Sequence, residues 1–148
     1  MGYYRTLHLD KEPFANTPDP DAFFYSRQHL DVLQKVEISV RLRRGLCVVT
    51  GQVGTGKTTL SRQLIQKLSG DQTVKTFLLP DPGFTKRKQF LAFLLDQFTG
   101  GTGSARYDEF SLKERLKSYL FTQGVEQDRT VVLLIDEGQK LPVFCIEI

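Results

Sequence analysis

The chain has 148 residues, of which 40% are hydrophobic and 25% are charged, and its formal net charge is +3. This composition is typical of a globular protein with one buried core, and the length argues against two domains. A net charge this small does not indicate nucleic-acid binding by itself, because that inference also needs clustering of the charges on one face. The longest apolar runs, 46–49 and 131–135, fall far short of the ~20 residues of a bilayer-spanning helix, which excludes a membrane segment within this chain.

The N-terminus lacks the apolar stretch and the cleavage site of a secretory signal. We therefore expect a cytoplasmic location, with membrane association only through regions beyond this chain. Cys47 and Cys145 both lie in apolar stretches. We interpret them as buried, reduced thiols rather than as a disulfide or a metal site.

Residues 1–25 form an irregular lead-in segment in this interpretation, because three prolines break any helix there. The expected domain is then 26–148. Ser26 is suited to be the N-cap of a helix that runs through Val40, and Gly45 is suited to end it. The apolar run 46–50 follows, and it predicts a short strand buried on both faces of a parallel sheet.

Further helices and strands alternate along the chain. The glycine-rich loop 51–58 opens a helix that Gly70 ends, and the apolar run 74–79 predicts a strand that stops at the prolines and glycine of 80–83. Thr85 is expected to cap a helix with apolar residues spaced between positions 90 and 98. A flexible glycine-containing loop, a further helix and a last strand are predicted at 99–107, 112–120 and 131–135.

This order of elements predicts an α/β domain with a mostly parallel sheet and helices on both of its faces. The glycine-rich loop follows the first predicted strand, and Asp136 and Glu137 follow the last one. Ligands bind beyond the carboxyl ends of the strands in such sheets. We therefore expect the two polar clusters to form a single site.

The glycine-rich loop has the pattern of a phosphate-binding loop. Its residues are Gly51, Gln52, Val53, Gly54, Thr55, Gly56, Lys57 and Thr58, followed by Thr59. Backbone N–H groups at a helix N-terminus bind the negative charges of a polyphosphate, and glycines let the backbone approach them closely. In this pattern Lys57 contacts the β- and γ-phosphates and Thr58 binds magnesium. The alternative is an ordinary glycine-rich turn, which would leave Lys57 beside the positive end of the helix dipole.

The acidic pair after the last strand complements this loop. The carboxylate of Asp136 can complete the coordination of Mg²⁺ alongside Thr58. Glu137 is suited to orient or deprotonate an attacking water, which favours hydrolysis over transfer of phosphate to a small substrate. Gln139 is either a sensor of the γ-phosphate or a surface amide. The plain alternative for the acidic pair is a solvated strand end.

Other polar and aromatic groups favour structural roles. Arg41, Arg43 and Arg44 are interpreted as cations that complement the dipole at a helix end rather than as a nucleic-acid patch. The cluster 86–88 is interpreted as a solvated basic patch, with partner binding as the alternative. His8 and His29 lack the neighbours of a metal site or a nucleophile–base pair, and we interpret them as surface residues. The aromatic run 23–25 is expected to pack on the core rather than against a nucleotide base.

Four segments together resemble the ExeA/GspA family, which are AAA-type ATPases of the bacterial general secretion pathway with relatives in type IV pilus biogenesis. These segments are Tyr3-Tyr4 with Pro13-Phe14, the run 19–25, the loop region 50–60, and 133–139. The resemblance covers nearly the whole chain. One departure is Gly138, where the family usually has alanine between the acidic pair and the glutamine.

The resemblance implies an AAA-type P-loop NTPase with a three-layer sandwich fold, and it assigns the two motifs as Walker A and Walker B. It implies ATP and Mg²⁺ as cofactors, with Lys57 on the phosphates, Thr58 and Asp136 on the metal, and Glu137 as the catalytic carboxylate. It also implies that the sheet continues beyond Ile148 with a strand between the loop strand and the acidic strand. We therefore expect an N-terminal fragment of the ATPase domain that binds nucleotide weakly and hydrolyses it poorly by itself.

Four functions stay open at this point. The first is an ATPase that drives assembly of a secretion or pilus machine, with protein partners and a possible homo-oligomer. The second is a transposition or DNA-associated ATPase, so nucleic acid stays open as a partner. The others are a small-molecule kinase, against which Glu137 argues, and a nucleotide-gated binding module with little catalysis. No guanine-reading Asn-Lys-x-Asp element occurs in the sequence, which favours ATP over GTP.

Overall fold

The computed structural model describes residue 6 and residues 24–147. The chain divides into two compact units between Leu64 and Ile65. The expected lead-in segment and His8, together with the first two resemblance segments, lie largely or wholly outside the described residues. Within the part of the chain that is described, no helix combines the length and the apolar composition that crossing a bilayer would need.

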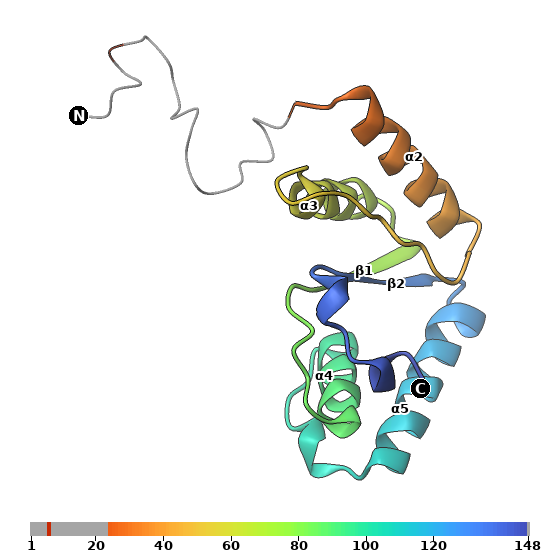
Figure 1. Cartoon of the computed structure of the whole chain (residues 1–148). Helices are drawn as coiled ribbons and strands as arrows, with labels where there is room; N and C mark the ends of the chain where they lie inside the picture. Colours follow the sequence, from red (N-terminus) through yellow and green to blue (C-terminus); the bar gives the residue numbers. More distant parts are fainter. Residues whose placement is uncertain (1–5, 7–23, 148) are drawn as a thin grey trace. The chain divides into compact units, whose positions relative to one another are not determined.

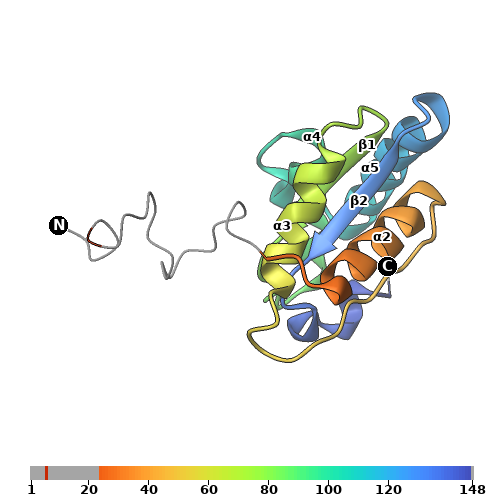
Figure 2. The same ribbon diagram turned by 90° about the horizontal axis from the view of Figure 1, so that it is seen from above.

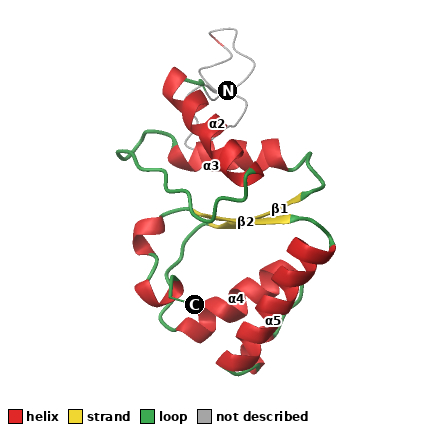
Figure 3. Ribbon diagram, turned by 90° about the vertical axis from the view of Figure 1, so that its right-hand side faces the viewer, coloured by secondary structure: helices red, strands yellow, loops and turns green. Residues whose placement is uncertain are grey.

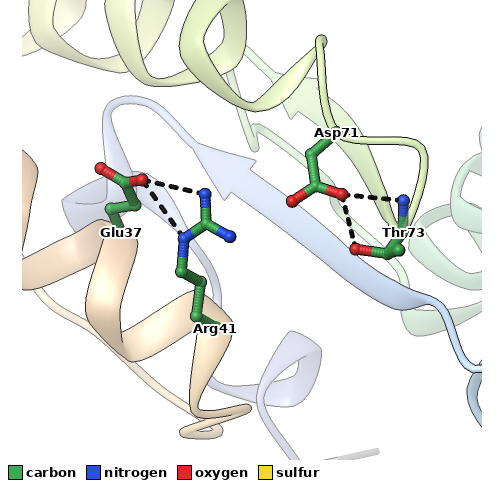
Figure 4. A network of polar contacts seen from close by, with 4 residues as sticks. All are labelled: Glu37, Arg41, Asp71 and Thr73. Carbon is green, nitrogen blue, oxygen red and sulfur yellow. Dashed lines mark hydrogen bonds and ion pairs between the residues drawn. The ribbon is translucent and has the colours of Figure 1, made fainter.

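The first unit contains helix α2, Arg27–Arg41, and the start of α3, Lys57–Leu68 (Figure 1). The prediction that Ser26 caps the first helix is confirmed, because its hydroxyl accepts the backbone N–H of His29 at 3.2 Å. On the face of α2, Arg41 pairs with Glu37 one turn earlier at 3.1 Å (Figure 4). A pair at this spacing adds a few tenths of a kcal/mol, on the order of 0.3.

The predicted end of α2 at Gly45 is wrong. The helix ends at Arg41, and Arg43 takes the left-handed conformation with φ of 52°. The N–H groups of Arg43 and Arg44 bond to the carbonyls of Val40 and Ser39, which are left without helical partners at the end of the helix. This is a Schellman motif with arginine at the position that glycine usually occupies.

The predicted strand 46–50 is absent. These residues belong to no strand, and the side chains of Leu46 and Val48 are 83% and 71% exposed. An apolar run forms a strand only if a neighbouring strand satisfies its N–H and C=O groups, and the described sheet consists of two other strands. The prediction that Cys47 is buried is wrong for the same reason, whereas Cys145 is buried as expected.

The second unit is built on a parallel two-stranded sheet. β1, Val74–Leu79, pairs with β2, Thr130–Ile135, so that Val74 lies opposite Thr130 and Leu79 opposite Ile135. Figure 2 shows the two strands side by side. Just before β1, one carboxylate oxygen of Asp71 accepts both the N–H and the hydroxyl of Thr73, which turns the chain into the strand (Figure 4). The predicted strands 74–79 and 131–135 are confirmed, as β1 and β2.

Two helices cover one face of this sheet: α4, Arg87–Thr99, and α5, Glu109–Phe121 (Figure 3). Short helices connect or follow these elements; they are η2 at Ser104–Arg106, the π-helix η3 at Thr122–Glu126, η4 at Gly138–Lys140 and η5 at Val143–Cys145. The 99–107 loop, which we predicted to be flexible, contains the short helix η2. Gly100 and Gly103 within it have φ of 65° and 86°, which only glycine adopts at no steric cost.

The core of the second unit lies between the sheet and these two helices. Alternate residues of the strands face it, and the rings of Phe77 on β1 and Phe98 on α4 lie 4.7 Å apart. Leu91 and Leu112 are fully buried at its centre. The members buried most deeply are Leu79, Phe90, Leu91, Ala92, Leu94, Leu95, Phe98, Leu112, Leu116 and Cys145.

The predicted cap of α4 is wrong by one residue. Lys86 occupies the N-cap position and its side chain caps nothing. Thr85 instead donates its hydroxyl and its backbone N–H to the side-chain oxygen of Gln89, at 2.9 and 3.3 Å. The side chain of Gln89 therefore binds the Thr85 hydroxyl, which we had predicted to cap the helix.

Candidate functional site

The glycine-rich loop of the first unit leads directly into α3, as predicted. Thr55 closes the loop, because its hydroxyl and its N–H both donate to the carbonyl of Gln52, at 2.8 and 3.4 Å. The carbonyl of Gly56 accepts the N–H of Leu60 at 2.8 Å. The hydrogen bonding of α3 thus begins inside the loop, which places the loop at a helix N-terminus, where anions bind favourably.

Two glycines explain why the loop needs this residue type. A Cβ atom at Gly51 would lie 2.9 Å from the hydroxyl oxygen of Thr55, a distance that Cβ contacts do not reach. Gly56 has φ of 81°, in the left-handed region that is costly for residues with a side chain. A larger residue at either position would disturb the turn that presents the backbone to a ligand.

Lys57 is folded back onto the loop. Its ammonium donates to the carbonyl oxygens of Gly51 and Gln52, at 2.9 and 2.7 Å. The positive charge is therefore held over the same short segment whose N–H groups would contact a polyphosphate. Between these contacts, the side chain of Val53 is fully exposed.

The acidic cluster lies at the carboxyl end of β2 in the second unit. Asp136 continues the ladder, because its N–H donates to the carbonyl of Leu79 at 2.9 Å. Its carboxylate accepts the N–H of Glu137 at 3.0 Å, and Glu137 has a left-handed backbone with φ of 52°. Gln139 donates its side-chain amide to the Glu137 carboxylate at 2.6 Å. The structure thus brings the three predicted polar residues together, with Glu137 and Gln139 exposed and Asp136 half-buried.

An ion pair connects the segments that follow β1 and β2 at this edge of the sheet. Lys140 follows the acidic pair, and its ammonium lies 3.5 Å from the carboxylate of Asp81, which follows β1. Both charged groups are more than half exposed, so the pair contributes little to stability. It nevertheless links the segments that leave the two parallel strands on the side where ligands bind such sheets.

The predicted metal ligands fit magnesium by their chemistry. Mg²⁺ prefers oxygen donors and retains several waters, so one hydroxyl and one carboxylate beside a nucleotide are enough from the protein. Among the described residues, neither the hydroxyl of Thr58 nor the second carboxylate oxygen of Asp136 makes a hydrogen bond. The two residues belong to different units, and a single site built from both clusters stays a prediction.

One of the three charges of the basic cluster 86–88 is engaged in contacts within the protein and is not simply solvated. The guanidinium of Arg87 donates to the carbonyl of Phe144 at 3.2 Å and lies 3.6 Å from the carboxylate of Glu109. Arg87 therefore links α4 to α5 and to the segment after β2. Only Lys86 and Lys88 remain as exposed charges of this cluster.

His29 and the aromatic run depart from the interpretation based on sequence. His29 is half-buried, and its ring contacts Ser26 and the carbonyl of Thr55 in the glycine-rich loop. The packing predicted for the aromatic run is wrong for Phe24, which is 83% exposed, while the hydroxyl of Tyr25 donates to Gln63 on α3. The position of His29 three residues after a capping serine was the only signal of its role, because nothing in the sequence links it to the loop.

Comparison with known proteins agrees with this geometry. The AAA domain family matches residues 40–148, which include the loop and the acidic cluster. General secretion pathway protein A of Aeromonas hydrophila is 31% identical to this chain over 143 aligned positions, and the alignment covers 94% of the chain. No solved structure gives a significant match to the chain.

The chain spans 24% of the length of the Aeromonas hydrophila protein, so the likeness concerns one part of that protein. The family match covers most of this chain and both of its polar clusters. The resemblance to the ExeA/GspA proteins and the α/β fold class are therefore confirmed. The chain belongs to the AAA domain family.

Proposed function

We propose that the chain binds ATP with Mg²⁺ on the loop 51–59 and is the nucleotide-binding part of an ATPase. The position of the Lys57 ammonium over the carbonyls of Gly51 and Gln52 carries this proposal. Because the ammonium is held against the backbone of the loop, a polyphosphate that binds the loop N–H groups would also meet this charge. Membership of the AAA domain family supports a nucleotide as the ligand.

Thr58 and Asp136 are the proposed magnesium ligands and Glu137 the proposed catalytic carboxylate. When bound, the metal would neutralise charge on the β- and γ-phosphates. The amide of Gln139 holds one oxygen of Glu137, which leaves the other oxygen to accept a proton from water. A base next to the metal ligand favours hydrolysis over the transfer of phosphate to a metabolite.

Binding is the first property to test. The experiment measures the Mg²⁺-dependent affinity of the chain for a fluorescent ATP analogue, with GTP as competitor, in the wild type and in Lys57→Ala. We expect binding that is lost or strongly weakened in the variant and that ATP displaces better than GTP. Equal affinity of the two proteins would contradict the assignment of the loop.

Hydrolysis is tested separately, by phosphate release. Replacing Glu137 with glutamine keeps the size of the side chain and removes its basicity. We expect Glu137→Gln to retain nucleotide binding and to lower turnover by about 100-fold or more, the range of general-base catalysis. A variant that hydrolyses ATP as fast as the wild type would remove Glu137 from the mechanism.

We further propose that the whole protein energises a bacterial secretion or type IV pilus machine through protein partners in the cell envelope. The likeness to a general secretion pathway protein supports this role. The test is deletion of the gene in its host, followed by measurement of secreted proteins and pili. A defect in either that wild-type protein restores and Lys57→Ala does not restore is expected, and normal secretion and piliation after deletion would contradict the role.

A further inference from the structure

The ring of His29 connects helix α2 to the glycine-rich loop. Its Nε2 atom lies 2.9 Å from the carbonyl oxygen of Thr55, and its Nδ1 atom lies 2.9 Å from the hydroxyl of Ser26. The backbone N–H of Ser26 also approaches Nδ1, at 3.4 Å. All of these groups lie in the first unit of the chain.

The partners of His29 determine which of its nitrogens carries the proton. A carbonyl oxygen only accepts hydrogen bonds, so Nε2 must donate to Thr55. A backbone N–H only donates, so Nδ1 must accept from Ser26. The hydroxyl of Ser26 accepts the N–H of His29 at 3.2 Å and has its own proton left for Nδ1. In the neutral imidazole, these contacts therefore place the proton on Nε2.

The contact with Thr55 bears on the orientation of the next peptide group. The peptide between Thr55 and Gly56 is planar and trans, so its N–H points away from its carbonyl oxygen. Glycine tolerates almost any backbone angle, and this peptide would otherwise rotate at little cost. With the carbonyl bound to His29, the N–H of Gly56 is directed away from α2.

We propose that His29 is a positioning residue of the nucleotide site, one that holds the Thr55–Gly56 peptide with its N–H directed to the phosphates. The inference rests on the proposed function of the loop and deepens it. A second contact supports the same arrangement, since the hydroxyl of Tyr25 donates to Gln63 on α3. The start of α2 thus holds both the loop and the helix that the loop opens.

This role predicts an effect on phosphate binding in particular. A peptide that rotates freely withdraws one N–H from the phosphates and leaves the contacts of the base unchanged. Complete loss of one hydrogen bond to a charged group lowers affinity by about 10- to 100-fold, and a peptide that only becomes free to rotate loses part of this, about three- to tenfold. We expect the same factor for a fluorescent ATP analogue and for inorganic triphosphate, which has no base.

The test compares two substitutions at one position. His29→Phe keeps a ring of similar shape and removes the donor, so it should lower both affinities. His29→Gln places a side-chain N–H₂ near the position of Nε2, so it should restore most of the loss. Gln28→Ala, in the exposed neighbouring residue, is the control and should bind as the wild type does. Thermal unfolding of each variant separates a loss of fold from a loss of positioning.

The outcomes distinguish this inference from the proposed function. If Lys57→Ala loses binding while His29→Phe binds as tightly as the wild type, His29 has no positioning role and the loop remains the site. If Lys57→Ala binds normally, the assignment of the loop falls, and the role of His29 falls with it. The ¹⁵N chemical shifts of the imidazole provide a test without nucleotide, and a proton on Nδ1 would overturn the inference.

Discussion

The ammonium nitrogen of Lys57 lies 2.9 Å from the carbonyl oxygen of Gly51, at the opposite end of the loop that the lysine closes. A second carbonyl, that of Gln52, lies 2.7 Å away. Binding of a polyphosphate would exchange these neutral acceptors for charged ones. The positive ammonium would then face negatively charged oxygens, and this Coulomb attraction favours the bound state.

Lys57→Ala should therefore weaken binding of the ATP analogue by about 10- to 100-fold, the loss expected for one charged hydrogen-bonding group. Lys35→Ala is a matched control, because it removes an exposed lysine of the same unit. Isothermal titration measures both affinities. A similar loss in the two variants would mean that net charge, rather than the loop, governs binding.

The two cysteines should react with a thiol reagent at very different rates. Cys47 is exposed, whereas Cys145 is buried, and burial raises the pKa of the Cys145 thiol and so disfavours the reactive thiolate. We expect one fast thiol in the native chain and two in denaturant. Cys47→Ser should abolish the fast reaction and Cys145→Ser should leave it. A slow native reaction at Cys47 would indicate that residues 46–50 are buried after all.

Leu112 should be among the most costly core positions to truncate. It is fully buried between α4 and α5, and Leu112→Ala should lower the free energy of unfolding by about 2–5 kcal/mol. Leu120→Ala is the control, because it makes the same change in the same helix at a side chain that is 44% exposed. Urea denaturation followed by circular dichroism measures both. Equal losses would contradict the assignment of Leu112 to the core.

The cap of α5 should make stability depend on pH. The carboxylate of Asp108 accepts the N–H and the hydroxyl of Ser111 at 2.9 and 2.8 Å, and these hydrogen bonds lower the pKa of Asp108 below its usual 3.8. A carboxyl group whose pKa falls on folding stabilises the protein above its unfolded pKa. That contribution is lost as the pH falls through the folded pKa.

Asp108→Ala should accordingly lower the melting temperature at pH 7, and the difference from the wild type should shrink as the pH falls below about 4. Asp108→Asn keeps an acceptor for the helix N–H without the charge. It should recover part of the stability and show no such pH dependence at this position. A constant difference between the wild type and Asp108→Ala down to acid pH would contradict the role of the carboxylate.

The helices α4 and α5 and the strands β1 and β2 were predictable from sequence. Periodic apolar residues identified α4 and α5, since these helices pack on each other, and β1 and β2 stood out as apolar runs between turn residues. The run 46–50 has the same pattern and forms no strand in the structure. A strand depends on a partner elsewhere in the chain, and the pattern of its own residues carries no information about that partner.

The candidate site was predictable to the extent that it is local. The residues of the loop 51–59 lie next to one another in the sequence, and so do those of the cluster 136–139. The spacing of residue types within each segment was therefore enough to predict its chemistry. His29 lies 26 residues before the carbonyl that it contacts, and no periodicity connects the two. The cap of α4 was also not predictable, because the hydroxyl of Thr85 donates to the side chain of Gln89 and does not cap the helix.

The pairing of β1 with β2 has a consequence for how the chain acquires its structure. Every ladder position joins residues as far apart as Val74 and Thr130, a separation of 56 residues. Closing so long a loop costs entropy before any hydrogen bond of the sheet is gained, whereas α4 and α5 make their contacts across one short connection. The helical hairpin should therefore form early and the sheet late. During synthesis on the ribosome, β1 stays unpaired and its apolar face stays exposed until β2 has been made. We expect the chain to be most prone to aggregation in this interval.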